Sequence, residues 1–376
     1  MWTGPVIPWV TIETLTPETM SVASVGESPR DFASWQRVLQ RLLSKTPAVY
    51  DGLTTLEVAE AIRAARIGAQ ELARTVRTGA GRFRLLLRPV FGPAGDVHAV
   101  RLWLGPDDTP APEPPAAVGA VWDLDNQTIE QPVGITRLTG GSPEQYVPRI
   151  SLAELFHRAA SFDRHAEVLD LLYDPAGGGR LQFDAAITHG GTRPGRWRFT
   201  IRSRDDERTR GAWLLVEDVT VPDTPAAPPT LERIGLREAH RRAGTHLAVL
   251  QLDFPSISHW LTDPAPWIRW DYLFRPVDVF HPGDRARLAE LGARLDTGES
   301  AGVTVGTLNY AGGYTPTSLL LYPYPGCSST RLAIAQLVRM AGDPARPAPA
   351  DFGHPIGYDE QLHHRLAAGG DRSSAC

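Results

Sequence analysis

Residues 195–220 read GRWRFTIRSRDDERTRGAWLLVEDVT, two alternating runs separated by an acidic turn around Asp205 and Asp206. Alternation of apolar and polar side chains is typical of a half-buried strand, so this stretch predicts an antiparallel hairpin. Trp197 and Phe199 stand two residues apart and therefore mark one face of the predicted sheet as buried. The opening recurs as GRFR at 81–84, which indicates an internal repeat.

The chain of 376 residues is long enough for two or three domains. Two proline-rich stretches, TPAPEPPAA at 109–117 and VPDTPAAPPT at 221–230, divide it, because proline lacks an N–H and fixes φ. We expect both to be extended, semi-rigid spacers. The predicted division is an N-terminal domain at 1–108, a linker at 109–117, a central domain at 118–221, a linker at 222–230, a C-terminal domain at 231–340 and a polar, mobile tail at 341–376.

Each of the three segments has the same layout. A strand–turn–strand pattern opens it, helical patterns follow, and a long hairpin closes it. The openings lie at 9–26, 120–134 and 246–260, and the hairpins at 81–105, 195–220 and 303–324. Strands with helices between them, without alternation of one strand and one helix, predict an α+β class. We therefore expect three tandem small domains, each an antiparallel sheet with helices packed on it.

The stretch VFHPGDR at 279–285 has two interpretations. Proline is favoured at the first helical position, so Pro282 predicts a helix start with His281 as N-cap and Asp284 at the third position. Alternatively, His281 and Asp284 are metal ligands, but such a site needs a further ligand at suitable spacing. A looser copy, LFHRAASFDR at 155–164, stretches the His-to-Asp spacing from three residues to six, which favours architecture over a metal site.

Residues 53–76, LTTLEVAEAIRAARIGAQELARTV, offer a helix-turn-helix as one interpretation. Acidic residues share this segment with its arginines, and the formal net charge of the chain is −5. A nucleic-acid reader presents cations on one exposed face, so two amphipathic helices over a sheet are the better prediction. No nucleic-acid partner is expected.

Aromatic side chains are concentrated in the central segment and are the strongest candidates for a site. They can form an ordinary core, or they can form the wall of an apolar cavity that binds a small ligand. The candidate ligand-binding residues are Trp122, Phe156, Phe162, Phe183, Trp197, Phe199 and Trp213.

The central segment resembles a PAS domain in the closing RGAWLLVEDVT at 210–220 and the preceding GRWRFTIRSRDD. VDVFHPGDRARL at 277–288 resembles a helix opening found in many PAS domains. Together with the phrases at 9–43 and 309–315, the whole of 8–340 is similar to an actinobacterial, mycobacterial-type family of triple sensor-domain proteins. In that family a PAS domain lies between PAS- or GAF-like domains.

The resemblance implies a signalling or ligand-sensing protein without an output domain of its own. No catalytic residue or metal site is predicted, since no nucleophile–base pair, metal cluster or phosphate loop is visible, and the sequence leaves the cofactor unknown. His157 and His165 are conceivable haem ligands, and Cys327 and Cys376 do not match the flavin-binding cysteine of light-sensing PAS domains. We expect a cytoplasmic protein without membrane insertion, whose partners are a small molecule, a signalling protein or a second copy. The alternative is a protein-interaction scaffold with self-filled pockets.

Overall fold

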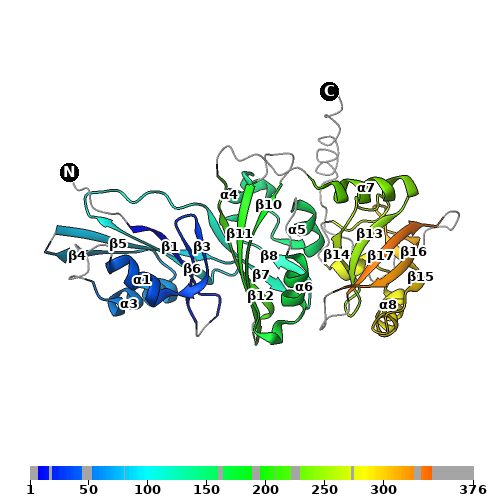
Figure 1. Cartoon of the computed structure of the whole chain (residues 1–376), viewed down its shortest axis with the longest axis horizontal. Helices are drawn as coiled ribbons and strands as arrows, with labels where there is room; N and C mark the ends of the chain where they lie inside the picture. The colour runs from blue at the N-terminus through cyan, green and yellow to red at the C-terminus, as the bar shows by residue number, and fades with distance from the viewer. Residues whose placement is uncertain are drawn as a thin grey trace, which may run out of the picture.

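The computed structural model describes residues 7–16, 19–44, 53–79, 81–159, 164–188, 195–207, 209–221, 229–271, 275–325 and 332–340. They form three antiparallel sheets, each accompanied by helices, in three successive domains along an elongated molecule (Figure 1). The predicted α+β class with three tandem sheets is therefore confirmed. We refer below to the N-terminal (7–106), central (117–218) and C-terminal (231–340) domains. The predicted tail at 341–376 lies outside the described residues.

The N-terminal domain has a six-stranded sheet with its helices on one face. Its elements are β1 (Ile7–Glu13), β2 (Ser21–Val25), β3 (Ser28–Ser34), α1 (Trp35–Ser44), α3 (Thr55–Gly68), β4 (Leu72–Thr78), β5 (Gly81–Phe91) and β6 (Val97–Pro106). The strand order is β3-β2-β1-β6-β5-β4, so the first strand pairs with the last at the centre of the sheet.

The central domain repeats this arrangement. Its elements are β7 (Ala117–Asp123), β8 (Thr128–Glu130), α4 (Ile135–Thr139), β9 (Arg149–Ser151), α5 (Leu152–Arg158), α6 (His165–Tyr173), β10 (Arg180–Ile187), β11 (Gly195–Asp206) and β12 (Thr209–Asp218). The strand order is β10-β11-β12-β7-β8-β9, and again the first strand pairs with the last. GRFR and GRWR each open the strand before the last, β5 and β11, so the repeat marks equivalent positions.

The C-terminal domain has five strands. Its elements are α7 (Leu231–Ala243), β13 (His246–Gln251), β14 (Ser256–Trp260), α8 (Pro282–Leu295), β15 (Ala301–Leu308), β16 (Tyr314–Pro323) and β17 (Leu332–Arg339). The strand order is β14-β13-β17-β16-β15. All three sheets therefore share a core order in which two opening strands lie beside a closing three-stranded meander.

The helix start at VFHPGDR is confirmed, with one difference in its bonding. His281 is the N-cap and accepts from the Gly283 N–H at 3.1 Å, and Pro282 is the first helical residue. The Asp284 carboxylate accepts from the Gly306 N–H on β15 at 2.8 Å. Asp284 therefore anchors α8 to the sheet, a role that the sequence did not predict.

Residues 53–76 form neither a helix-turn-helix nor two helices, so the prediction of two helices is wrong. The first half is α3, and the second half is the edge strand β4. The helix ends because Gly68 is followed by Ala69 in the left-handed conformation, with φ 49°. Beyond this point the run LARTV is mostly exposed, as expected of an edge strand, and Val76 turns into the core opposite Phe83.

The domains pack through different surfaces. The N-terminal and central sheets meet face to face, with Ala23, Ala99 and Leu215 at the centre of their contact. The C-terminal domain instead packs its edge strand β14 beside α5 (Figure 1). The first linker also packs: Trp9 Nε1 donates to the Pro112 carbonyl at 2.8 Å, and Arg88 pairs with Glu113. The linker therefore lies as a strap against the N-terminal sheet, whereas the sequence predicted only a spacer.

Candidate functional site

An apolar cavity lies between the inner face of the central sheet and the helices α5 and α6. It leaves about 20 Å³ in which a water-sized sphere can be centred. The lining side chains are all apolar: Trp122, Ile129, Leu155, Phe156, Ala159, Val168, Leu172, Phe183, Ala185, Ile187, Phe199, Ile201 and Leu214. That space is close to the volume of a single water molecule.

Four of the seven predicted aromatic residues line this cavity: Trp122, Phe156, Phe183 and Phe199. They come from β7, α5, β10 and β11, which the fold brings together. Trp197 is buried beside Phe199, with ring centroids 6.3 Å apart, but it is not part of the lining. That these residues bind a ligand stays a prediction.

One of the seven, Trp213, lies on the other face of the sheet. Trp213 is on β12 next to Leu214, which faces the cavity, so its own ring points to the opposite face of the sheet. There it packs against the N-terminal domain. The run WLLV is apolar at every position, so alternation could not assign its faces. Phe162 lies outside the described residues.

Among the described residues, the side chains that line the cavity supply no free hydrogen-bonding group. Their single polar atom, Trp122 Nε1, donates to the Leu172 carbonyl at 2.8 Å. An apolar cavity of this kind does not hold water well, because water needs two or more polar partners. Its chemistry suits an uncharged apolar molecule and offers nothing to a charged one.

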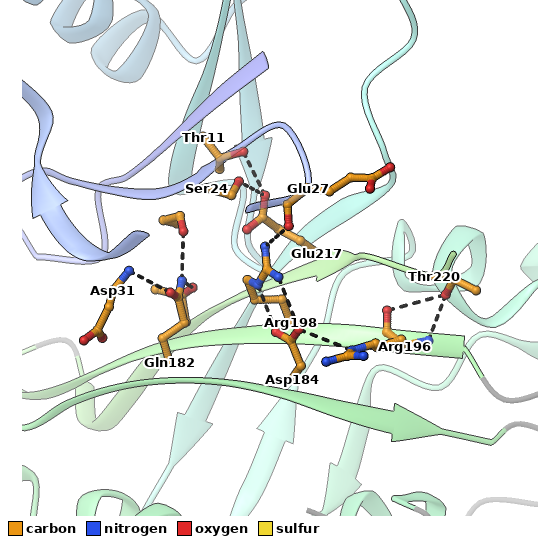
Figure 2. Close-up of polar contacts among 12 residues, drawn as sticks. Thr11, Ser24, Glu27, Asp31, Gln182, Asp184, Arg196, Arg198, Glu217 and Thr220 are labelled. Carbon is orange, nitrogen blue, oxygen red and sulfur yellow. Dashed lines mark hydrogen bonds and ion pairs between the residues drawn. The ribbon is translucent and has the colours of Figure 1, made fainter. Parts of the chain in front are cut away.

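The strands that line the cavity carry the junction with the N-terminal domain on their other face. On β11, Phe199 and Ile201 face the cavity, while Arg198, Thr200 and Arg202 alternate with them. On β10, Gln182 alternates with Phe183 in the same way and reaches across the junction (Figure 2). A shift of these strands would therefore change the cavity on one face and the contacts with the N-terminal domain on the other.

Buried charges form the core of this junction. Glu13 on β1 is fully buried, and Arg202 donates to its Oε1 from Nη2 at 2.7 Å and from Nε at 3.0 Å. Glu217 on β12 accepts from the hydroxyls of Thr11 at 2.8 Å and Ser24 at 2.9 Å (Figure 2). Buried carboxylates need such donors, and here each domain supplies donors to a buried carboxylate of the other.

Two further side chains of the central sheet reach the N-terminal backbone (Figure 2). Arg198 pairs with Asp184 at 2.9 Å and donates to the Glu27 carbonyl, also at 2.9 Å. Gln182 donates to the Ala23 carbonyl at 3.0 Å and accepts from the Asp31 N–H at 2.9 Å. These bonds fix the docking register of the two sheets.

In the same junction, His98 of the N-terminal domain stacks on Trp213 of the central domain. The His98 ring lies 4.3 Å from the Trp213 ring and parallel to it, and the Arg204 guanidinium lies 4.0 Å from the Trp213 centroid. His98 Nδ1 donates to the Leu214 carbonyl at 2.8 Å. Gly119 leaves room for this ring, since a Cβ there would lie 2.4 Å from it. Burial lowers the pKa of His98 to about 4, so the ring is neutral at pH 7.

The backbone is strained where β3 meets the central domain. Asp31 and Phe32 have φ of 41° and 59°, a region that non-glycine residues rarely adopt. This conformation inserts the Phe32 ring beside two arginines of the central sheet, with Arg202 at 4.7 Å and Arg180 at 5.4 Å from its centroid. Strain of this kind persists only where surrounding contacts hold it.

The junction with the C-terminal domain is built from neutral groups and rings. Tyr173 on α6 shares a hydrogen bond of 2.8 Å with the Ser258 hydroxyl on β14. Gln127 has φ 53°, donates to the Phe254 carbonyl at 2.8 Å, and accepts from the Ser256 hydroxyl. Both junctions thus hold a non-glycine residue in the left-handed region.

Histidines of this second junction are packed against aromatic rings. The His157 ring lies edge-on to Trp270 at 5.0 Å, and burial, followed by the nearby Arg158, lowers the pKa of His157. The described residues hold no group of three or more metal-ligating side chains, which leaves the metal interpretation of His281 and Asp284 without a third ligand. Within the described residues, no helix is long and apolar enough to cross a membrane.

Known proteins resemble the chain in two ways. Residues 8–113 match the family model described as "Rv3651-like, N-terminal". A crystal structure of an uncharacterized protein from Mycobacterium tuberculosis is similar over 96% of this chain and 99% of that chain, with a TM-score of 0.67 and 19% sequence identity. At that identity the similarity shows the fold alone. The expected resemblance to a mycobacterial three-domain family is confirmed.

A second solved structure, an RNA-binding light-oxygen-voltage receptor, matches over 59% of this chain and 95% of that chain. Its TM-score is 0.24 and its sequence identity 11%. No protein with a curated description matches the sequence.

Proposed function

We propose that the protein is a non-catalytic sensor in which the central domain binds a small, uncharged apolar molecule and the N-terminal domain responds. One observation carries this proposal. Strands β10, β11 and β12 expose cavity-lining side chains on one face and the buried polar junction on the other. A ligand that moves Phe199 or Leu214 moves a strand whose next residue contacts the N-terminal domain.

The physical requirement is a difference in ligand affinity between two arrangements of the junction. The cavity in its present form has room for about one water-sized sphere, so a ligand of aromatic size must displace side chains or strands. Displacement of β11 or β12 would disturb Arg198 and Trp213, which are held by bonds of defined geometry. Binding and junction geometry are therefore coupled in this proposal through the sheet itself.

Ligand binding can be tested with three neutral probes, benzene, indole and 1-octanol, by thermal shift and native mass spectrometry. A bound probe at ten times its Kd raises the free energy of unfolding by about 1.4 kcal/mol. Ala185→Leu fills the cavity and should abolish the shift, since Ala185 is part of the lining. Ala120→Leu is the matched control, because Ala120 is equally buried at 3% exposure but does not line the cavity.

Transmission has its own measurement. Amide hydrogen exchange in β1 and β2 should change when the probe binds, although neither strand touches the cavity. A probe that binds the central domain without any change in β1 or β2 contradicts the sensing part of the proposal. In that case the central domain would bind the probe without transmitting the binding event to the N-terminal domain.

A second candidate function is a protein-interaction scaffold whose central cavity is filled by its own side chains. The small size of the cavity, about 20 Å³, favours it. In that case no probe raises the melting temperature, and Ala185→Leu and Ala120→Leu cost similar stability through overpacking. This outcome would reject the sensor.

A further inference from the structure

The C-terminal sheet has an outer face that is apolar and only partly covered. Four side chains on it are exposed: Leu320 and Tyr322 at 38%, Val338 at 36% and Met340 at 44%. We call these four residues the outer patch. The strands β15, β16 and β17 lie at the end of the molecule furthest from the N-terminal domain (Figure 1).

The sequence of β16 explains why the patch exists. Leu319 and Leu321 point into the core beneath α8 and are fully buried, so Leu320 and Tyr322 between them point outward. The neighbouring strand adds Ile334 opposite Tyr322. A strand with one solvated face normally alternates apolar with polar residues, whereas the second half of β16, at 319–322, is apolar on both faces. Opposite Leu320, however, the neighbouring strand places the polar Gln336. An apolar cross-strand group on an exposed face indicates a contact surface.

The same face is already an interface at its other end. Val249 on β13 and Leu332 on β17 belong to this face and are buried against the core of the central domain. Val249 is paired with Ile334, which is paired with Tyr322, so the covered and exposed parts form one continuous surface. The outer patch therefore extends an established junction to the free end of the sheet.

The uncharged side chains of the outer patch indicate what kind of surface it binds. None of its four side chains is charged. At the junction of the N-terminal and central domains, by contrast, Glu13 on one surface pairs with Arg202 on the other, so the two surfaces differ in charge. A neutral apolar surface is complementary to itself, and charge is depleted at the centre of homodimer interfaces. We propose that the outer patch binds the outer patch of a second copy of this chain around a twofold axis.

The test is the oligomeric state of the full chain by sedimentation velocity between 1 and about 200 µM, a range that covers the Kd of standard-sized interfaces. The wild-type chain should be dimeric within this range. Tyr322→Glu and Leu320→Glu bring like charges together across the twofold axis and should weaken dimerisation at least 100-fold. Far-UV circular dichroism and the melting temperature confirm that each variant is folded.

Ile67→Glu is the matched control, because Ile67 is an exposed apolar residue on α3, with 84% of its surface accessible. It should leave the dimer unchanged. A wild-type chain that is monomeric at about 200 µM overturns the proposal, and would mean that another segment or a different protein covers the patch. A dimer that survives Tyr322→Glu, or that Ile67→Glu also dissociates, overturns it as well.

Discussion

The N-terminal face of the central domain presents arginines and carboxylates, whereas its C-terminal side presents a tyrosine hydroxyl, a glutamine and aromatic rings. At the first junction Arg202 and Glu13 are an ion pair, with side chains 13% and 0% exposed. At the second, Tyr173 and Ser258 are neutral partners. Removing one member of a buried ion pair leaves the other charge buried without a partner. Removing one hydroxyl of a neutral pair leaves only an uncharged polar group without its hydrogen bond. The first junction should therefore be far more sensitive to substitution.

The largest effect is expected from Arg202→Met. It leaves the Glu13 carboxylate buried without its main partner and should lower the free energy of unfolding by about 3–5 kcal/mol, measured by urea denaturation. Arg210→Met is the control, since Arg210 pairs with Asp125 with side chains 51% and 61% exposed. That substitution should cost less than about 1 kcal/mol. Equal losses in the two variants would contradict the importance of the buried pair.

The second effect is a dependence on pH. The pKa of His98 is lowered from 6.5 to about 4 in the folded chain, so the folded state binds its proton more weakly than the unfolded state. The neutral His98 ring therefore contributes to the free energy of unfolding, and this contribution is complete above pH 6.5. It is lost as the pH falls towards 4, which lowers the free energy of unfolding by roughly 3 kcal/mol in total. Denaturation midpoints between pH 4 and 7.5 measure it.

His98→Gln removes the titrating group and should flatten this part of the pH profile. His240→Gln is the control, because His240 lies on α7 away from the first junction. A wild-type profile that His98→Gln leaves unaltered would assign the acid sensitivity to other groups.

The smallest effect is expected at the second junction. Tyr173→Phe removes the hydroxyl that bonds Ser258, at a cost of about 1 kcal/mol. A cycle with Ser258→Ala isolates the coupling between the two hydroxyls. If Tyr173→Phe costs as much as Arg202→Met, the contrast between a charged and a neutral junction fails.

Much of the fold could be predicted from local patterns. The hairpins, their turns and the helix start at His281-Pro282 follow from alternation, glycine and proline, whose effects act within a few residues. The segment at 53–76 was mispredicted because its second half, LARTV, suits a helix and an edge strand almost equally. Tertiary contact of Val76 with the core decides in favour of the strand.

The cavity was predicted better than the junctions. Trp197 and Phe199 alternate with arginines, so their burial could be inferred from one strand alone. The burial of Arg198 and Arg202 could not, because arginines between apolar residues normally face solvent, and here a second domain covers them. Likewise, no local signal marks Phe32 for the left-handed backbone that places its ring at the junction.

The charged chemistry of the first junction also bears on how the chain is made. Synthesis completes the N-terminal domain before the central strands exist, and domains generally fold as units in that order. During this interval the face that later docks carries Glu13, Thr11 and Ser21, which water solvates well, beside the small apolar Ala23 and Ala99. A docking face of leucines would instead wait as an aggregation-prone sheet. The Glu13 carboxylate, whose partner Arg202 belongs to the later central domain, thus keeps part of this face hydrated until the central strands are made.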